Sequence, residues 1–544
     1  MASCEKCSIE FEISPKDLEF YKHFDLSAPT KCPECRLQHR LAFRNERTLY
    51  KRTSDISGQQ IISIYTPENR YKVCSTEEWW ADKHEPLKYG QDFDFSRPFF
   101  EQFEELLLNV PRITLFNVNP TNSDYTQQSY YNKNCYLSFV LKECQDCTYV
   151  THAQKAVDCI DSSFIYNSEL CYECINCEKL YGCIGCQSCQ NSSNLIFCYD
   201  LIGCHDCIGC YGLRNKRYYI MNEPHTKEEY EEKKRMLELN KFKKFLNCKS
   251  YFIELSKNQP HRATQNLNVE NSTGDYLIDC KNAKLCYNCF NDEDCAYCTW
   301  MFHSQDCMDV YGMGYGKYVY EGVGVESLNN CAINTFVSDS HDVFYSDCCF
   351  YSSYLFGCAG IKNEKYCIFN KRYSPEEYEK LKAKIIEHMK KTGEWGKNFP
   401  VSLSPFAYNE TAANDFFPLS KEETLKQGFT YKEPDKRDYL PQTTTLPDDL
   451  KETPDSITNE TLACINCGKN YKITPVELKF YHKLNVPIPR KCQDCRYKNR
   501  MQQRNSRKIY ERSCHKCSKQ IHTTYSPDRP EKIYCEECYG ALVN

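Results

Sequence analysis

The chain has 544 residues, a net charge of −5, and 39 cysteines beside 20 glycines and 23 prolines. This length predicts about three to four domains. The composition excludes both a small secreted disulfide scaffold and a disordered chain. No apolar run approaches the ~18 residues of a membrane span, and the first residues lack a secretory signal. We therefore expect a cytoplasmic protein with no membrane partner, whose reduced cysteines bind metal, catalyse or pack.

Residues 1–55 are predicted to form a treble-clef-like zinc module. Two Cys-x2-Cys pairs are separated by twenty-four residues, and four thiolates suit a closed tetrahedral zinc site. The predicted ligands are Cys4, Cys7, Cys32 and Cys35. Between the pairs, Ser14 and Pro15 are typical of a helix start, and this helix must end before Pro29.

A second helix after Cys35 carries a row of arginines on one face, at spacings of four, four and three residues. The row consists of Arg36, Arg40, Arg44 and Arg47. Two interpretations stay open: the row binds a polyanion, or it is a solvated or internally ion-paired stripe. Residues 31–52 carry seven Lys/Arg against two Glu, a net charge of +5, which favours the first interpretation.

Residues 56–111 form an aromatic-rich segment. We expect it to cover the open first coil of the repeat that follows, because an uncovered edge invites pairing with other chains. A ligand-binding aromatic box is the alternative.

A twelve-residue period organises residues 112–222. One column consists of Cys135, Cys147, Cys159, Cys171 and Cys183, and a second of Cys174, Cys186, Cys198 and Cys210. Such a period predicts a first β-solenoid with coils of about twelve residues. Its narrow interior suits small side chains, so we expect these cysteines to pack as small hydrophobes. Ligation of an iron–sulfur cluster is the alternative.

The same period returns in residues 263–370, where Gly357–Cys358 repeats Gly209–Cys210. The predicted fold is therefore mainly β: two related β-solenoid halves, capping helices, and small α+β zinc modules at both termini. Three further segments are predicted. They are a helical insertion at 223–262, a capping helix at 371–395 and an extended linker at 396–456.

Residues 457–544 are predicted to form a double zinc module. The first site repeats the N-terminal spacing in Cys464, Cys467, Cys492 and Cys495, and the second consists of Cys514, Cys517, Cys535 and Cys538. The arginine row returns as Arg496, Arg500, Arg504 and Arg507. Residues 490–519 hold eleven Lys/Arg against two acidic residues, a net charge of +9.

The N-terminal copy has lost this additional site. Ser54 and Ser57 replace its first cysteine pair. In place of the second pair we expect Cys74, as the one surviving cysteine, and Glu77. The sequence therefore predicts about three zinc ions per chain.

The stretches Cys4–Arg36 and Cys464–Arg496 resemble the probable zinc-ribbon (treble-clef-like) domain of many bacterial proteins. With Asn132–Tyr136 and Leu213–Lys216, the arrangement is similar to cysteine-rich zinc-ribbon proteins of candidate-phyla-radiation bacteria. This resemblance implies zinc and a cytoplasmic bacterial setting. It implies no activity.

Three functions follow as hypotheses. The first is a non-enzymatic nucleic-acid-binding protein, associated with RNA or the ribosome rather than DNA, that uses both arginine rows on phosphates. The second is a scaffold that binds acidic proteins or another copy of the chain. The third is an iron–sulfur or thiol redox protein. No spacing typical of a catalytic site is present.

Overall fold

The computed structural model describes residues 1–434 and 437–543, which form two compact units. Unit 1 contains Met1–Phe116, Thr264–Glu433 and Arg507–Ile509. Unit 2 contains Asn117–Ala263, Pro434–Ser506 and Tyr510–Asn544. Each unit therefore joins a cysteine module from one end of the chain to a repeat domain that is distant in sequence.

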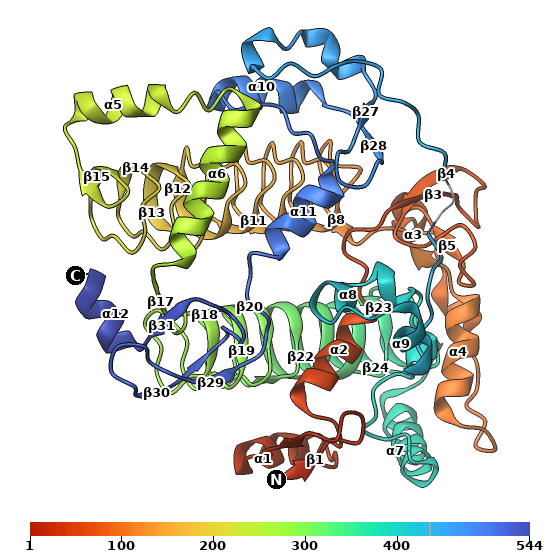
Figure 1. The fold of residues 1–544 in the computed structure, drawn as a ribbon. Helices are drawn as coiled ribbons and strands as arrows, with labels where there is room; N and C mark the ends of the chain where they lie inside the picture. Colours follow the sequence, from red (N-terminus) through yellow and green to blue (C-terminus); the bar gives the residue numbers. More distant parts are fainter. Residues whose placement is uncertain (435–436, 544) are drawn as a thin grey trace. The chain divides into compact units, whose positions relative to one another are not determined.

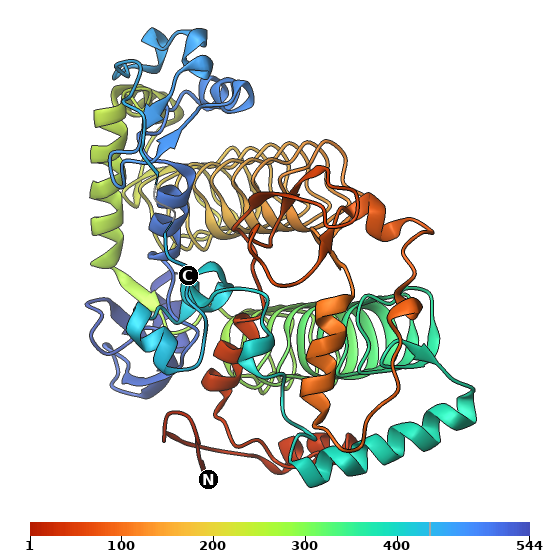
Figure 2. The same cartoon turned by 90° about the vertical axis from the view of Figure 1, so that its right-hand side faces the viewer.

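Unit 2 contains a ten-stranded sheet, here called the first ladder, in which consecutive strands pair in parallel up to a final antiparallel strand. Its strands are β7 (Asn117–Val118), β8 (Gln127–Tyr130), β9 (Phe139–Lys142), β10 (Thr151–Gln154), β11 (Ser163–Tyr166), β12 (Ile175–Tyr181), β13 (Gln190–Ile196), β14 (His205–Ile208), β15 (Arg217–Ile220) and β16 (Glu223–Pro224). The parallel register joins residues twelve apart, as in Thr151↔Ser163 and Ser163↔Ile175. Figures 1 and 2 show this chain wound into stacked coils.

Each coil is built from three-residue steps. Asn134, Leu137, Val140, Glu143 and Asp146 all have φ between +42° and +60°. The residue after each of them is buried in the coil. This left-handed conformation is unfavourable for most L-residues, whereas achiral Gly adopts it freely and Asn and Asp adopt it more easily than the others. This preference explains the abundance of Asn, Asp and Gly at these positions. Four such steps make the twelve-residue period.

Thiols fill the interior of the first ladder. The column from Cys135 to Cys183 is at most 2 % exposed. The thiol of Cys147 donates to the carbonyl oxygens of Gln145, at 3.3 Å, and Ala156, at 3.4 Å. The main-chain carbonyls of the same coil and the next one therefore serve as acceptors for these buried donors.

Unit 1 contains the second ladder, a nine-stranded sheet with the same kind of parallel register, as in Tyr287↔Thr299 and Thr299↔Tyr311. Its strands are β18 (Gly274–Ile278), β19 (Cys286–Phe290), β20 (Thr299–Phe302), β21 (Cys307–Met308), β22 (Tyr311–Phe344), β23 (Asp347–Phe350), β24 (Ser353–Phe356), β25 (Lys365–Ile368) and β26 (Lys371–Arg372). The offset that pairs Gly209 with Gly357 also relates the rest of the two ladders.

Helices flank both ladders. In unit 2, α5 (Lys227–Met236) is followed by α6 (Phe242–Lys257), whose Phe252 stacks 5.8 Å from Phe197 of the first ladder. In unit 1, α7 (Pro375–Thr392) buries one apolar face against the last coils of the second ladder. None of the helices in the described part of the chain is long and apolar enough to cross a membrane.

The aromatic segment 56–111 packs against the second ladder. It contains α3 (Thr76–Trp80), η1 (Pro86–Tyr89) and α4 (Phe99–Asn109). Phe99 of α4 contacts Phe356 and Phe369, at centroid distances of 5.7 and 5.2 Å. These rings belong to the end of the second ladder, so this aromatic face is buried there; the cover over the first coil of the first ladder stays a prediction. Sequence order suggested the neighbouring repeat, whereas the contact is long-range.

The cysteine modules consist of short strands and helices. The N-terminal module and the hairpin that follows it contain β1 (Ala2–Ser3), β2 (Glu10–Phe11), α1 (Pro15–His23), α2 (Pro33–Leu41), β3 (Tyr50–Thr53), β4 (Gln60–Ser63), β5 (Val73–Cys74) and β6 (Arg112–Ile113). The C-terminal module contains β27 (Leu462–Ala463), β28 (Asn470–Tyr471), α10 (Pro475–Leu484), α11 (Gln493–Met501), β29 (Tyr510–Ser513), β30 (Gln520–Thr523), β31 (Lys532–Tyr534) and α12 (Glu536–Val543). Strand β31 pairs in parallel with β17 (Pro260–Arg262).

The segment before the C-terminal module consists mainly of short helical turns. They are η2 (Val401–Leu403), η3 (Tyr408–Glu410), α8 (Ala412–Phe416), α9 (Lys421–Lys426), η4 (Leu450–Glu452) and η5 (Asp455–Asn459). In unit 1, Tyr408, Ala412 and Phe429 pack with Leu41 of α2 in one apolar cluster. This part of the predicted linker is therefore packed against the N-terminal module.

Candidate metal centres and their arginine helices

Three groups of four cysteines converge in the described residues. They are Cys4, Cys7, Cys32 and Cys35; Cys464, Cys467, Cys492 and Cys495; and Cys514, Cys517, Cys535 and Cys538. Within each group the four sulfur atoms all lie within 4.8 Å of one another. These are the twelve cysteines predicted as ligands from the Cys-x2-Cys spacing, and their grouping into three clusters that could hold a metal ion is confirmed.

The sulfur spacing fits a metal ion and not a disulfide. One Sγ–Sγ distance is 3.7 Å in each group, for Cys7 and Cys32, for Cys467 and Cys492, and for Cys517 and Cys535. A tetrahedron with metal–sulfur bonds of about 2.3 Å has edges of about 3.8 Å. All 39 cysteines are free thiols. Among the residues described, the ladder thiols form no such group.

Each site begins with a tight turn that aims backbone N–H groups at sulfur. In the first site, Ser8 donates to the carbonyl of Cys4 at 2.9 Å and has φ of 59°. The N–H of Cys32 donates to Cys4 Sγ at 3.3 Å. In the third site, the N–H of Ser518 likewise donates to the carbonyl of Cys514, and the N–H of Cys535 donates to Cys514 Sγ.

These N–H groups favour the thiolate. Burial raises the pKa of Cys4, yet hydrogen bonds from the backbone of Cys32, Cys7 and Lys6 outweigh it and bring the pKa to about 6. The same balance brings the pKa of Cys464 and of Cys514 to about 6. Each site therefore offers one thiolate at neutral pH before a metal binds.

The second cysteine pair of each module starts the arginine helix. Cys32 is the N-cap of α2, and Cys35 lies in its first turn. The N–H of Arg36 donates to the carbonyl of Cys32 at 3.0 Å. A metal on Cys32 and Cys35 therefore fixes the turn from which the arginine side chains project, and α11 begins in the same way at Cys492.

The arginines of α2 pair with an aspartate of the second ladder, within unit 1. Arg36 Nε and Arg40 Nη1 donate to the two carboxylate oxygens of Asp309, at 2.8 and 2.9 Å. The three side chains are between 0 and 4 % exposed. Arg36 also lies over the ring of Tyr297, 4.9 Å from its centroid. We call this arrangement the arginine clamp of unit 1.

Unit 2 contains the equivalent clamp. Arg496 Nη1 pairs with Oδ2 of Asp161, and Arg500 Nη1 pairs with Oδ1 of the same residue at 2.8 Å. Arg496 lies over the ring of Tyr149, 4.7 Å from its centroid. All four residues are buried. The repeat offsets relate Arg36 to Arg496, Asp309 to Asp161 and Tyr297 to Tyr149, so the interface is duplicated along with the sequence.

The remaining arginines of the two rows are also turned into the fold. Arg44 Nε pairs with Glu46 Oε1 at 2.6 Å, and Arg504 lies 3.5 Å from the centroid of Phe164. Arg507 lies 3.7 Å from the centroid of Phe416, and Arg47 is half-buried. Of the two open interpretations, the internally paired stripe therefore describes both rows. Helical periodicity predicts a shared face but cannot identify a partner from elsewhere in the chain.

A second acidic residue supports each clamp. Asp17 accepts from Lys284 Nζ at 3.0 Å and from the Tyr297 hydroxyl at 2.9 Å. In unit 2 the longer Glu477 takes its place and accepts from the hydroxyl of Tyr149 at 3.2 Å. Sequence analysis missed these residues, although both are the acidic N3 residues of capping boxes.

The lost fourth site is now a hydrogen-bonded cluster, and its residues differ from those expected. Ser54 Oγ donates to Glu78 Oε2 at 2.6 Å, and Ser75 N–H donates to the same oxygen at 2.7 Å. Burial raises the pKa of Glu78, but these bonds and one from Ser57 outweigh it and lower the pKa. The repeat offset aligns Ser75 with Cys535 and Glu78 with Cys538, so the assignment of Cys74 and Glu77 is wrong by one residue.

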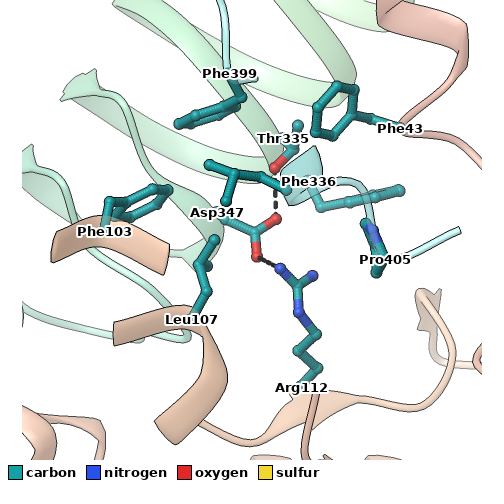
Figure 3. A pocket seen from close by; sticks show the side chains of 10 residues that line it. Phe43, Phe103, Leu107, Arg112, Thr335, Phe336, Asp347, Phe399 and Pro405 are labelled. Carbon is teal, nitrogen blue, oxygen red and sulfur yellow. Dashed lines mark hydrogen bonds and ion pairs between the residues drawn. The ribbon is translucent and has the colours of Figure 1, made fainter. Parts of the chain in front are cut away.

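A small pocket in unit 1 lies apart from the metal centres (Figure 3). At its floor Arg112 Nη2 pairs with Asp347 Oδ2 at 2.6 Å, and the Thr335 hydroxyl donates to Asp347 Oδ1 at 2.5 Å. Phe43 and Phe399 are among its aromatic walls. Both oxygens of the carboxylate are therefore engaged by the fold.

The twelve cysteines form three groups that could hold a metal ion, and arginines of both rows dock internally. A comparison of the chain with protein-family models and with curated proteins finds no match.

Proposed function

We propose that the protein is a zinc-dependent, non-catalytic binding scaffold. Zinc is the metal best suited to four thiolates in a closed tetrahedral site, and the 3.7 Å sulfur spacing fits its bond length. About three ions per chain would be structural, because each cysteine set leaves no coordination position open.

The observation that carries this proposal is the duplicated arginine clamp. In both units a helix that begins with two metal ligands inserts two arginines onto one buried aspartate of a ladder. Metal binding therefore supports a module, and the module holds the ladder. We propose further that both ladders are β-solenoids that serve as rigid spacers.

Metal removal tests this function directly. The purified chain should contain about three zinc ions and no visible absorption band, as expected without an iron–sulfur cluster. Treatment with a chelator should raise hydrogen exchange in α2 and α11, because the first helical turn loses its anchor. Unchanged exchange after complete metal removal would refute a metal-dependent scaffold. Exchange in α6 of unit 2, which contains no metal ligand, is the internal control.

Binding of a nucleic acid is the second candidate, and a surface other than the arginine rows supports it. His515, Lys516 and Lys532 surround the third metal site and are exposed. Lys519 is exposed too, although it contacts Glu537 at 3.1 Å. Cationic side chains of this kind suit phosphates, and RNA is the partner that we propose in preference to DNA.

The two candidates are separated by retention on RNA and DNA at low and high salt. We expect K516E/K532E to lose RNA retention at low salt, whereas K227E, an exposed change on α5, should not. Retention that is equal for both variants would reject this surface. A bound protein that survives nuclease treatment of the extract would instead favour a scaffold for acidic proteins or for a second copy.

A further inference from the structure

Each clamp connects parts of the chain that are far apart in sequence. In unit 2 the module of residues 434–506 meets a ladder of residues 117–224, and all of Thr264–Glu433 between them belongs to unit 1. In unit 1 the N-terminal module likewise meets a ladder that starts at Gly274. The junction between module and ladder in each unit is therefore non-covalent.

The recognition surface on each ladder is small and well defined. It consists of a tyrosine and an aspartate exactly one coil apart, Tyr149 with Asp161 and Tyr297 with Asp309. Two guanidinium groups meet the carboxylate, and one of them also covers the tyrosine ring. Nothing in this geometry requires the two partners to belong to one chain.

We propose that the clamps are exchangeable between copies, so that the module of one chain docks on the same ladder of a second copy. This inference rests on the proposed scaffold function and names the partner as another molecule of this protein. In the wild type, the covalent connection raises the effective concentration of the module near its own ladder, which favours the closed chain. Exchange becomes favourable when the closed clamp is broken.

The charges at Asp161 decide which pairs of variant chains gain by exchanging modules. In D161N the buried guanidinium groups of Arg496 and Arg500 lose the carboxylate that both contact, and Arg496 keeps Glu477 as its acidic partner, at 3.6 Å. In R496Q/R500Q the carboxylate of Asp161 stays buried without its arginines. A buried charge without its partner is strongly unfavourable. When the two variants exchange modules, one junction regains its arginines and its aspartate, and the other lacks the charges of Asp161, Arg496 and Arg500 together.

The test is co-expression of full-length D161N and R496Q/R500Q with different affinity tags. We expect co-purification about tenfold above that of two differently tagged wild-type chains, with about three zinc ions per chain. Co-purification at the wild-type level, from variants that retain metal and circular dichroism, would overturn the exchange.

The pair D309N with R36Q/R40Q repeats the test in unit 1 and keeps it decisive if the unit 2 variants fail to fold. The unchanged clamp of the other unit serves as the control in each case. These outcomes are independent of the chelation experiment, which tests the scaffold function by itself. Exchange can therefore fail while metal dependence holds, and metal dependence can fail while exchange is observed.

Discussion

Asp161 and Asp309 occupy equivalent positions in the two ladders, and each accepts hydrogen bonds from two arginines of a cysteine module. Both carboxylates have no exposed surface. The modules at opposite ends of the chain therefore dock by the same chemistry on different repeats.

Removal of the carboxylate charge should destabilise unit 1. In D309N, Arg36 and Arg40 lose their counter-charge while they stay buried, which costs about 3–5 kcal/mol. We expect lower unfolding free energy in urea and faster hydrogen exchange in α2. The control is D279N, an exposed position of the same ladder. A D309N chain as stable as D279N would show that the clamp contributes nothing.

The metal-free cluster at Ser54 should be convertible into a fourth metal site. The change S54C/S57C/S75C/E78C places four thiols where the C-terminal copy has its third site. Elemental analysis should then rise from about three zinc ions to about four per chain. C74S should leave the count at three, because Cys74 lies outside the cluster. A count that stays at three in the quadruple variant contradicts the corrected alignment.

The inward-facing Asp292 should make stability depend on pH. Burial raises the pKa of Asp292 to about 7, although the N–H of Ser304 opposes the shift. An unfolded Asp titrates near 3.9. The folded state thus prefers the protonated acid, so this stabilisation is complete below about pH 4 and is lost as the pH rises to about 7.

The variant D292C tests this dependence, because the repeat offset aligns Asp292 with Cys144. We expect D292C to unfold at a higher urea concentration than the wild type at pH 8. Its free energy of unfolding should be larger by a few kcal/mol, because one pKa unit corresponds to about 1.4 kcal/mol. The difference should shrink towards pH 5. A constant difference across this range would show that the carboxyl does not titrate there.

The thiols of the ladders should resist alkylation in the native protein. The exposed cysteines, Cys7, Cys467 and Cys517, belong to the candidate metal sites, and Cys248 is half-buried. The metal-loaded chain should therefore react at about one thiol, Cys248, and C248S should react at none. Chelation should add the twelve ligand cysteines. Rapid reaction of many thiols before chelation would mean that the ladder interior is open.

Much of the site was readable from the sequence because it is local. The four cysteines of each site come from two short turns at fixed spacing, and capping boxes mark α1 and α10. The direction of the arginine rows was not readable. Asp309 is one acidic residue among many, and it meets Arg36 only because the ladder and the module fold together.

One part of the fold was visible but overlooked. Asn, Asp or Gly stands at many of the third positions with positive φ, among them Asn134, Asp146, Asp158 and Gly182. The twelve-residue columns, which lie three residues apart, reveal part of this step, but the Asn, Asp and Gly positions before them were not used. The shorter period would have identified the inward positions, including Asp292, directly.

The three-residue step also constrains how this chain can change in length. Loss or gain of one residue in a coil would turn the later inward-facing side chains of that ladder to the surface. A change of three residues would keep the inward positions inward. It would, however, shift each later coil by one three-residue step relative to the coil before it. Within the body of a ladder, after its first coil, only whole coils of twelve residues can be added or removed without disturbing the stack, so natural variants of this protein should differ there in length by multiples of twelve.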